Sequence, residues 1–368
     1  MNSSKAEAAV GVFQQRMAEY KQLLDEDIKE YVREIKRSTL QDFGADARLA
    51  ADAYTSILER GGKRIRGALV LIGYEMSGGA NKKMILEAAR AIEMLHAYIL
   101  IIDDIQDRSV VRRGGPTAHI MLSDYHRAHR LADNEQHFGI SIALNAALLG
   151  SHAAQITLSE LDVKPAWRDE VIRIVNRTMM VTAHGQTKDI MNEVSADVTK
   201  EDIDRVLEWK TAHYTFLNPL HVGMVLAGGG KHATETITDY AMHAGRAFQI
   251  TDDILGTFGN EFDSGKSPMD DLREGKRTIL TMYAIEQAKP ADKNFLIHML
   301  GNHQLTQAEF QRCKDIIIET GALEYAKAEA QRHVEAAIKS LETDTNGWSD
   351  DGVAFLKGLA TYLLERYA

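Results

Sequence analysis

Apolar residues recur along this chain every three or four positions, the spacing that places them on one face of an α-helix. In the first 45 residues, charged side chains separate the members of such a set: Val10, Phe13, Met17, Leu24, Ile28, Tyr31 and Ile35. The same spacing predicts further helices over 47–59, 82–108, 138–160, 167–194, 201–226, 234–258, 276–288, 305–319 and 321–343. Alternating Val, Ile or Thr runs that end in Asn-Gly or Asp-Gly turns are nearly absent. The pattern therefore predicts an all-α protein.

Glycine and proline interrupt the helical pattern at a few places, which we interpret as turns. These are Gly61-Gly62, Gly114-Gly115-Pro116, Gly228-Gly229-Gly230 and the segment 260–269. No linker rich in Ser or Pro and no internal repeat divides the 368 residues. We expect a single domain over 46–368, a bundle of about ten or more helices around a central apolar cavity. A helical N-terminal extension over 1–45 precedes it.

Composition narrows the class of protein. The chain has 43 Lys and Arg against 53 Asp and Glu, and its formal charge of −10 argues against nucleic-acid binding and against a basic membrane-docking face. The single cysteine, Cys313, excludes an internal disulfide. Charged residues interrupt the first 30 positions, so they hold no apolar core of the signal-peptide kind. We expect a cytoplasmic protein.

Two long stretches carry no formal charge, Gln136 to Ser159 and Thr211 to Gly230. Both are long enough to test as transmembrane spans. Each contains interior polar residues, such as Asn145 in the first and Asn218 in the second. Such interruptions favour helices buried on all sides of a large core over helices in lipid.

The strongest local feature is an acidic cluster, Asp103-Asp104-Ile105-Gln106-Asp107, which directly follows an apolar run. On a helix, Asp103 and Asp107 lie one turn apart on the same face, and Asp104 is rotated by about 100°. Carboxylates at that spacing repel each other, and a divalent cation bound between them would relieve the repulsion. Oxygen ligands of this kind suit Mg²⁺, which also binds phosphates. The plainer alternative is a solvated acidic helix end.

Cationic residues stand close to this cluster and near the start of the chain. The adjacent Arg112 and Arg113 either neutralise the acids or each grip a separate phosphate through a planar guanidinium. The run Gly-Gly-Lys-Arg-Ile-Arg at 61–66 is a weak phosphate-binding signal, and a plain helix start explains it equally well.

A second acidic pair, Asp252-Asp253, also lies among apolar residues. Between the two acidic sites come Gln186 and Asp189, three positions apart and hence on one helix face, and then Lys210-Thr211. Two acidic faces could hold several Mg²⁺ ions around one diphosphate, and two cationic sets could hold two anionic ends. Apolar helices would supply a dry pocket for hydrocarbon. This combination suits ionisation of an allylic diphosphate.

In this order the motifs resemble those of the trans-isoprenyl diphosphate synthases, or polyprenyl synthetases. The resemblance covers about residues 45–290. It rests on GGKRIR at 61–66, His96, DDIQD at 103–107, RRGGPTAH at 112–119, GQTKD at 185–189, KT at 210–211, FQITDD at 248–253, GK at 265–266 and DLREGKRT at 271–278. Each motif alone is a weak signal. Their occurrence in the family's order along one chain argues against a chance resemblance. The resemblance implies the isoprenoid synthase fold.

The resemblance also implies roles for individual residues. Mg²⁺ ions, roughly three per site and replaceable by Mn²⁺, would bridge Asp103, Asp107 and Asp252 to an allylic diphosphate, with Asp104, Asp189, Asp253 and Gln186 nearby. The other partners of that diphosphate would be Arg112, Lys210, Thr211, Gln249, Lys266 and Lys276. Isopentenyl diphosphate would bind Lys63, Arg66, His96 and Arg113. His96 alone would be read as an ordinary core histidine. The family is commonly homodimeric, so we expect a homodimer that buries part of the two uncharged stretches.

The chain departs from the family pattern at some positions. The second aspartate motif usually ends in a third acid, where this chain has Gly256. The proline that often follows the Gly-Gly-Lys-Arg run is Gly67. None of the departures removes a residue proposed as a ligand.

Product length depends on the residues one helical turn before the first aspartate motif, since a chain held at Asp103 must run alongside that helix. Tyr98 is large and Ile99 is not. By resemblance, an aromatic five positions before the first aspartate, with none at four positions before it, indicates a synthase that stops at C20. An ordinary core role for Tyr98 is the alternative.

The predicted function is Mg²⁺-dependent head-to-tail condensation of isopentenyl diphosphate with an allylic diphosphate, yielding geranylgeranyl diphosphate and pyrophosphate. The alternatives are a farnesyl diphosphate synthase and a partner-dependent subunit of a heteromeric prenyl synthase. A terpene cyclase fits less well, because cyclases lack the Gly-Lys-Arg site for a second diphosphate.

Overall fold

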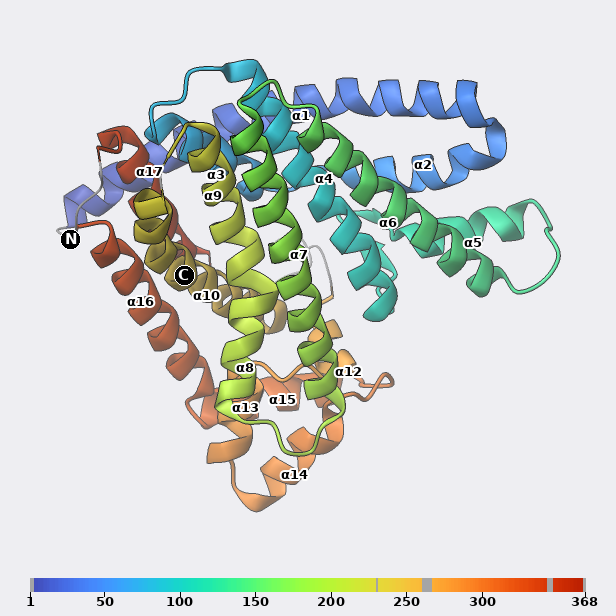
Figure 1. Ribbon diagram of the computed structural model, residues 1–368. Coiled ribbons are helices and arrows are strands. Elements are labelled where there is room, and N and C mark those ends of the chain that lie inside the picture. The colour runs from blue at the N-terminus through green and yellow to red at the C-terminus, as the bar shows by residue number, and fades with distance from the viewer. Residues whose placement is uncertain (1–2, 230, 260–266, 343–346, 367–368) are drawn as a thin grey trace.

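A computed structural model describes residues 3–229, 231–259, 267–342 and 347–366 (Figure 1). Its helices are α1 (Ser3–Phe43), α2 (Ala45–Glu59), α3 (Ile65–Met76), α4 (Lys82–Gln106), α5 (Ala118–Ala128), α6 (Glu135–Ser159), α7 (Pro165–Val194), α8 (Lys200–Val206), the π-helical η1 (Leu207–Leu217), α9 (Asn218–Leu226), α10 (Lys231–Phe258), α12 (Asp270–Glu274), α13 (Ile279–Gln287), α14 (Pro290–Met299), α15 (Gln307–Glu319), α16 (Ala322–Ser340) and α17 (Asp350–Glu365). The described strands are β1 (Val111–Arg112) and β2 (Gly115–Pro116), which pair in a small hairpin. The predicted all-α class is confirmed.

The helices expected from the apolar spacing are present, and the structure adds others. The expected helix over 201–226 is α8, η1 and α9 in unbroken succession. Helices α3, α5, α12, α14 and α17 form where the spacing predicted none. In α3 the reason is visible in its burial, because nearly every residue is buried and no one-sided apolar pattern exists to be read.

The N-terminal helix α1 packs into the body of the protein. Its Phe13, Tyr20, Leu24 and Ile28 are almost completely buried and belong to the same apolar cluster as residues of α3, α4 and α17. The ring centroid of Phe13 lies 5.2 Å from that of Phe355 on α17. Residues 3–43 are therefore helical, as expected of the extension, but they share the core of the domain.

The two uncharged stretches have different surroundings. Residues of η1 and α9, such as Phe216 and Leu220, are completely buried, as predicted for the stretch from Thr211. On α6 the prediction of burial on all sides is wrong, because Leu144, Leu148 and Ile156 are 43%, 55% and 56% exposed. Apolar surface for a partner is therefore offered by α6 and not by η1 and α9.

The central helices form the walls of the site. Figure 1 shows α4, α7 and α9 running through the middle of the molecule, with α12 to α15 packed beneath them. The lower part has its own apolar cluster, which includes Ile254 of α10, Leu272 of α12 and Phe310 of α15. This second cluster fixes the segment that carries the last predicted motif, residues 271–278.

Candidate active site

A cavity of about 840 Å³ lies among α3, α4, α7, η1, α10 and α12. Nearly all residues that the motifs singled out line it: Lys63, Arg66, His96, Tyr98, Ile99, Asp103, Arg112, Arg113, Gln186, Asp189, Lys210, Thr211, Gln249, Asp252, Asp253 and Lys276. Asp104 and Asp107 are not part of its lining, and Lys266 lies outside the described residues. Segments far apart in the sequence therefore meet around one hollow.

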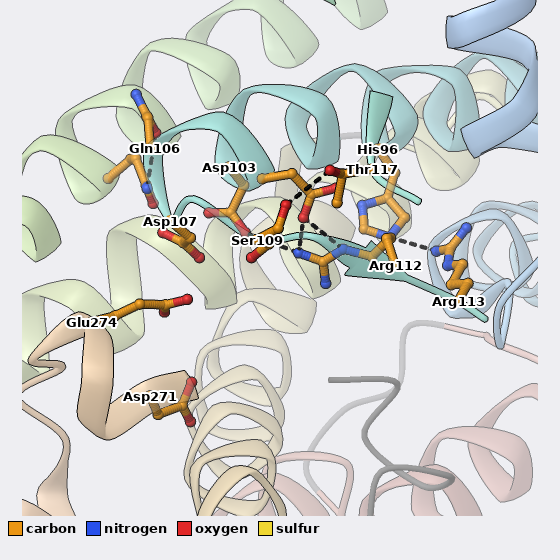
Figure 2. Close-up of polar contacts among 12 residues, drawn as sticks. His96, Asp103, Gln106, Asp107, Ser109, Arg112, Arg113, Thr117, Asp271 and Glu274 are labelled. Atoms are coloured by element: carbon orange, nitrogen blue, oxygen red, sulfur yellow. Dashed lines mark hydrogen bonds and ion pairs between the residues drawn. The ribbon is translucent and has the colours of Figure 1, made fainter. Parts of the chain in front are cut away.

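One part of the cavity, which we call the acidic end, gathers carboxylates and lysines. Helix α4 ends here, with Asp103 in its last turn and Asp107 at its C-cap. Nζ of Lys210 lies 2.6 Å from Asp189 and 3.6 Å from Asp103, and Nζ of Lys276 lies 3.3 Å from Asp107. Figure 2 shows Asp103 and Asp107 on the side of α4 that faces α12.

Both lysines remain charged at neutral pH. Burial lowers the pKa of Lys210, but the charges of Asp189 and Asp103 outweigh it, so that the pKa lies above its ordinary value. The pKa of Lys276 is likewise raised, against the effect of burial, chiefly by the charge of Asp107. In the free protein the two lysines thus offset part of the negative charge at the acidic end.

Asp104 has a different role from its neighbours. It is completely buried, and Arg112 donates to its Oδ1 from Nε at 2.8 Å and also from Nη2. The rotation of about 100° expected on a helix turns it away from the cavity. We therefore take Asp104 out of the proposed metal-ligand set and assign it the task of orienting Arg112.

The second acidic pair lies on α10. Nε2 of Gln249 donates to Asp253 at 2.8 Å, and Thr211 Oγ1 donates to Gln249 Oε1 at 2.6 Å. Burial raises the pKa of Asp253 well above its ordinary value, against the effect of the Gln249 hydrogen bond. Asp252 is more exposed and forms an ion pair of 2.5 Å with Arg366, just beyond the end of α17. Asp252 is thus the better candidate for binding a cation.

Gly256 stands where, by the family resemblance, a third acid usually ends the second aspartate motif, and a side chain from another segment occupies the space beside it. A Cβ atom at Gly256 would lie 2.3 Å from Oδ2 of Asp271, a distance that no real Cβ contact shows. Asp271 belongs to α12 and also lines the cavity. A carboxylate from another segment therefore fills the space that a side chain at 256 would need.

The π-helical geometry of η1 gives the site several of its polar groups. Its wider turn brings Lys210, Thr211, Tyr214 and Thr215 into the cavity lining. Helix α7 approaches η1 very closely at Gly185, where a Cβ would lie 2.4 Å from the backbone nitrogen of Lys210. Only glycine fits at this position, which explains the first residue of the predicted motif at 185–189.

The opposite part of the cavity, which we call the cationic end, contains Lys63, Arg66, His96 and Arg113. Arg113 and Gly114 form the tip of the β1–β2 hairpin with φ angles of 51° and 71°, which fit a type I′ turn. This turn directs the two adjacent arginines apart, Arg112 toward Asp104 and Arg113 toward His96. Figure 2 shows the side chains of Arg112 and Arg113 pointing in different directions.

His96 is the centre of the cationic end. Its Nε2 lies 3.3 Å from a nitrogen of Arg66 and 3.3 Å from a nitrogen of Arg113, and its Nδ1 contacts the hydroxyl of Tyr214. Guanidinium groups only donate, so Nε2 accepts and the ring proton is on Nδ1. Burial and then the charges of the two arginines lower the pKa of His96 well below its ordinary value. The ring is therefore neutral.

Positive charge is concentrated here without an equal number of acids. Burial, together with the charges of Arg64, Arg112 and Arg66, lowers the pKa of Arg113 to about 10 against the opposing charge of Glu93. Such a cluster is suited to an anion that carries more than one charge.

Helix α4 connects the two ends, because His96 and Asp103 are two turns apart on it. Tyr98 and Ile99, between them in sequence, line the cavity together with Met179 of α7 and Phe248 of α10. The cavity therefore has an apolar wall suited to a hydrocarbon chain.

The acidic end fits Mg²⁺ that arrives with a diphosphate. No three His, Cys, Asp or Glu residues in the described parts of the chain form a ready ligand set for a metal ion. Lysines stand among the carboxylates instead. Mg²⁺ is commonly held by one or two carboxylates together with substrate phosphates and waters, which is what Asp103, Asp107 and Asp252 can offer.

Nothing in the sequence indicated two residues of the site, Arg366 and Tyr214. Arg366 lines the cavity, stacks on the ring of Phe248 and pairs with Asp252. Tyr214 contacts His96, and Arg66 lies over its ring at 4.3 Å from the centroid. No pattern signals these two, since a single Arg near the C-terminus and a single Tyr in an uncharged stretch are ordinary residues.

Comparisons with known proteins agree with this geometry. Residues 47–317 match the sequence profile of the family described as polyprenyl synthetase. The chain belongs to the polyprenyl synthetase family. Membership makes it a prenyltransferase, as the motifs predicted.

Individual polyprenyl synthetases are similar over most of their length. A geranylgeranyl diphosphate synthase of Sulfolobus acidocaldarius is 30% identical over 86% of this chain and 90% of its own. A geranylfarnesyl diphosphate synthase of Aeropyrum pernix is also 30% identical, over 84% of this chain and 92% of its own. The crystal structure of a Corynebacterium glutamicum geranylgeranyl pyrophosphate synthase, complexed with isoprenyl diphosphate and magnesium, has a TM-score of 0.89 at 29% identity, covering 94% of this chain and 98% of that chain.

The structure also bears on the membrane question. Among the helices of the described residues, none combines the length and the apolar character that a transmembrane span needs. The cytoplasmic location stays a prediction from the sequence.

Proposed function

We propose that this prenyltransferase condenses isopentenyl diphosphate head-to-tail with an allylic diphosphate and releases pyrophosphate, with Mg²⁺ as cofactor. The observation that carries the proposal is a single cavity with an acidic end, a cationic end and an apolar wall. Two diphosphates then have separate sites, and the hydrocarbon groups have a dry space in common.

The cationic end binds isopentenyl diphosphate in this proposal. Lys63, Arg66 and Arg113 supply the positive charge, and the neutral His96 keeps the two arginine side chains in place by accepting from both. Because this binding site is already cationic, it does not need a metal ion to hold a diphosphate.

The acidic end binds the allylic diphosphate. Asp103, Asp107 and Asp252 would hold Mg²⁺, which when bound supplies charge stabilisation for the departing pyrophosphate. Lys210 and Lys276 pair with these acids in the free protein and can turn to phosphate oxygens once the acids bind cations. Roughly three Mg²⁺ ions per site, and replacement by Mn²⁺, are expectations that come from the family resemblance.

The apolar wall protects the reacting carbon and limits the product. An allylic cation formed beside Phe248, Met179 and Ile99 meets little water. We propose that Tyr98 closes the path of the growing chain at C20, so that the product is geranylgeranyl diphosphate. The second candidate product is farnesyl diphosphate. By resemblance, synthases that stop at C15 carry aromatics at both positions, whereas this chain has Ile99 beside Tyr98.

A product assay tests the proposal. Radiolabelled isopentenyl diphosphate is incubated with the purified chain, Mg²⁺ and an allylic primer, and the products are sized by chromatography. We expect a C20 product. Products formed from the allylic substrate alone would indicate a terpene cyclase, and no product without a second protein would indicate a partner-dependent subunit.

We also propose a homodimer formed through α6 and α7. Leu144, Leu148 and Ile156 recur at intervals of four and eight on α6, and Met180 on the adjoining α7 is 63% exposed. Light scattering at micromolar concentration should give a dimer for the wild type and a monomer for Leu148→Glu. Ile318→Glu, at a 52% exposed position on α15, is the control that should stay dimeric. A monomeric wild type would contradict the proposal.

A further inference from the structure

The middle cation of the run at 61–66 differs from its neighbours. Lys63 is exposed at the cavity, but the side chain of Arg64 is only 2% exposed and is absent from the residues to which we assigned a diphosphate. Arg64 also has a positive φ of 53°, in the left-handed region that only a few non-glycine residues adopt. A buried arginine in such a backbone conformation needs strong partners to hold it there.

Those partners come from three helices. Nε of Arg64 donates to Asp25 of α1 at 2.8 Å, Nη1 lies 3.3 Å from Glu93 of α4, and Nη2 donates to the carbonyl of Leu58 of α2 at 2.9 Å. Arg64 is the N-cap residue of α3. The guanidinium therefore joins the start of α3 to α1, α2 and α4.

Glu93 holds the start of α3 through a second contact. Its Oε1 accepts the backbone N–H of Gly67 at 2.8 Å, in the first turn of α3. A Cβ at Gly67 would lie 2.7 Å from Cδ1 of Leu24 on α1, so α1 and α3 are in close contact here. Lys63 and Arg66, which face the cavity, flank this anchored segment on either side of Arg64.

We propose that Asp25 of the N-terminal helix is a positioning residue for isopentenyl diphosphate, acting through Arg64 on Lys63 and Arg66. This inference rests on the proposed function. Without the Asp25 carboxylate, Arg64 keeps only Glu93 as a charged partner and is free to shift toward it. The two diphosphate-binding side chains move with the turn, while the acidic end keeps its contacts.

The chain contains a matched control on the same helix. Asp27 of α1 forms an ion pair with Arg90 of α4, with Nη1 of Arg90 2.9 Å from each carboxylate oxygen. This pair also joins α1 to α4, but neither residue lines the cavity. Replacing Asp27 therefore measures how far the affinity for isopentenyl diphosphate changes when α1 loses an ion pair to α4 that does not involve Arg64.

The test compares Asp25→Asn, Asp25→Glu and Asp27→Asn. Titration calorimetry with isopentenyl diphosphate alone should give a Kd about tenfold higher for Asp25→Asn, the loss expected for one charged hydrogen bond to a diphosphate. KM for the allylic diphosphate should not change, Asp25→Glu should restore most of the affinity, and Asp27→Asn should bind as the wild type does. Thermal unfolding confirms that each variant is folded.

The inference is overturned if Asp25→Asn binds isopentenyl diphosphate as tightly as the wild type, or if Asp27→Asn weakens binding equally. Should Asp25→Asn fail to fold, Arg64→Lys is compared with Arg90→Lys. A lysine cannot reach Asp25, Glu93 and the Leu58 carbonyl at once, so Arg64→Lys should weaken isopentenyl diphosphate binding and Arg90→Lys should not. Equal affinity of these two variants would overturn the inference. A wild type that makes no prenyl product, by contrast, contradicts the proposed function. The two failures are therefore distinguishable.

Discussion

The two ends of the cavity carry charge of opposite sign and differ in how that charge is balanced. At the acidic end, Lys210 and Lys276 neutralise only part of the charge of Asp103, Asp107 and Asp189, so a cation enters a network that stays net negative. At the cationic end, arginines surround a neutral histidine, and the charge is only partly balanced. Under the proposed function, the same ligand group, a diphosphate, is bound with metal ions at one end and without them at the other.

The largest expected effect is at the acidic end. Asp103→Ala should lower kcat on the order of 10²–10³-fold, because one contact that stabilises charge on the leaving group is lost. Steady-state kinetics at saturating Mg²⁺ measures this. Asp124→Ala removes an exposed carboxylate that pairs with Arg127 on α5 and should leave kcat unchanged. Near-normal turnover of Asp103→Ala would remove this residue from the metal site.

The adjacent arginines allow the two ends to be separated. Arg113→Ala should raise KM for isopentenyl diphosphate about tenfold, and Arg112→Ala should raise KM for the allylic diphosphate by a similar factor. The reason is their divergence at the hairpin tip, which sends Arg112 toward Asp104 and Arg113 toward His96. Each variant is the control of the other. Equal changes in both KM values would contradict the division.

The apolar wall that both substrates share gives a qualitative effect. Tyr98→Ala should deepen the cavity and shift the product to C25 or longer, because each added isoprene unit gains apolar contact where it met a clash. Product sizing by chromatography measures the shift, and Ile99→Ala should change it less. An unchanged product distribution for Tyr98→Ala would remove Tyr98 as the floor of the cavity.

The smallest expected effect concerns pH, because His96 should add no pH dependence to KM for isopentenyl diphosphate. The pKa of His96 is lowered, so the ring gains no proton when the pH falls from 8 to 6 and adds no charge to the cationic end. The ratio of KM values for isopentenyl diphosphate between His96→Asn and the wild type should stay constant over this range. A ratio that rises steadily as the pH falls would show that the histidine becomes charged.

Sequence reasoning was most successful where a motif lies on one helix. Asp103 and Asp107 follow from helical spacing alone, and so does the separation of Asp104 from them. Only the structure shows that this rotation joins Asp104 to Arg112. The motif register brought Lys210, Thr211 and Gln249 into one site, although nothing local indicates that Thr211 donates to Gln249 or that Lys210 donates to Asp189.

The rest depends on tertiary packing. Arg366 and Asp252 are more than a hundred positions apart, and no periodicity connects them. The anchoring of Arg64 by Asp25 depends on how α1 packs, which the amphipathic pattern of α1 does not specify. The exposed side of α6 carries leucines, so composition alone made it look like a core helix.

The claim that only one of the two diphosphate sites needs a metal ion is tested most directly by binding. Titration calorimetry with geranyl diphosphate alone and with isopentenyl diphosphate alone is carried out in Mg²⁺ and again in excess chelator. Removing Mg²⁺ should weaken geranyl diphosphate by about 10²-fold or more, equivalent to roughly 2.7 kcal/mol, and should leave isopentenyl diphosphate nearly unchanged. An equal loss of affinity for both substrates would contradict the account.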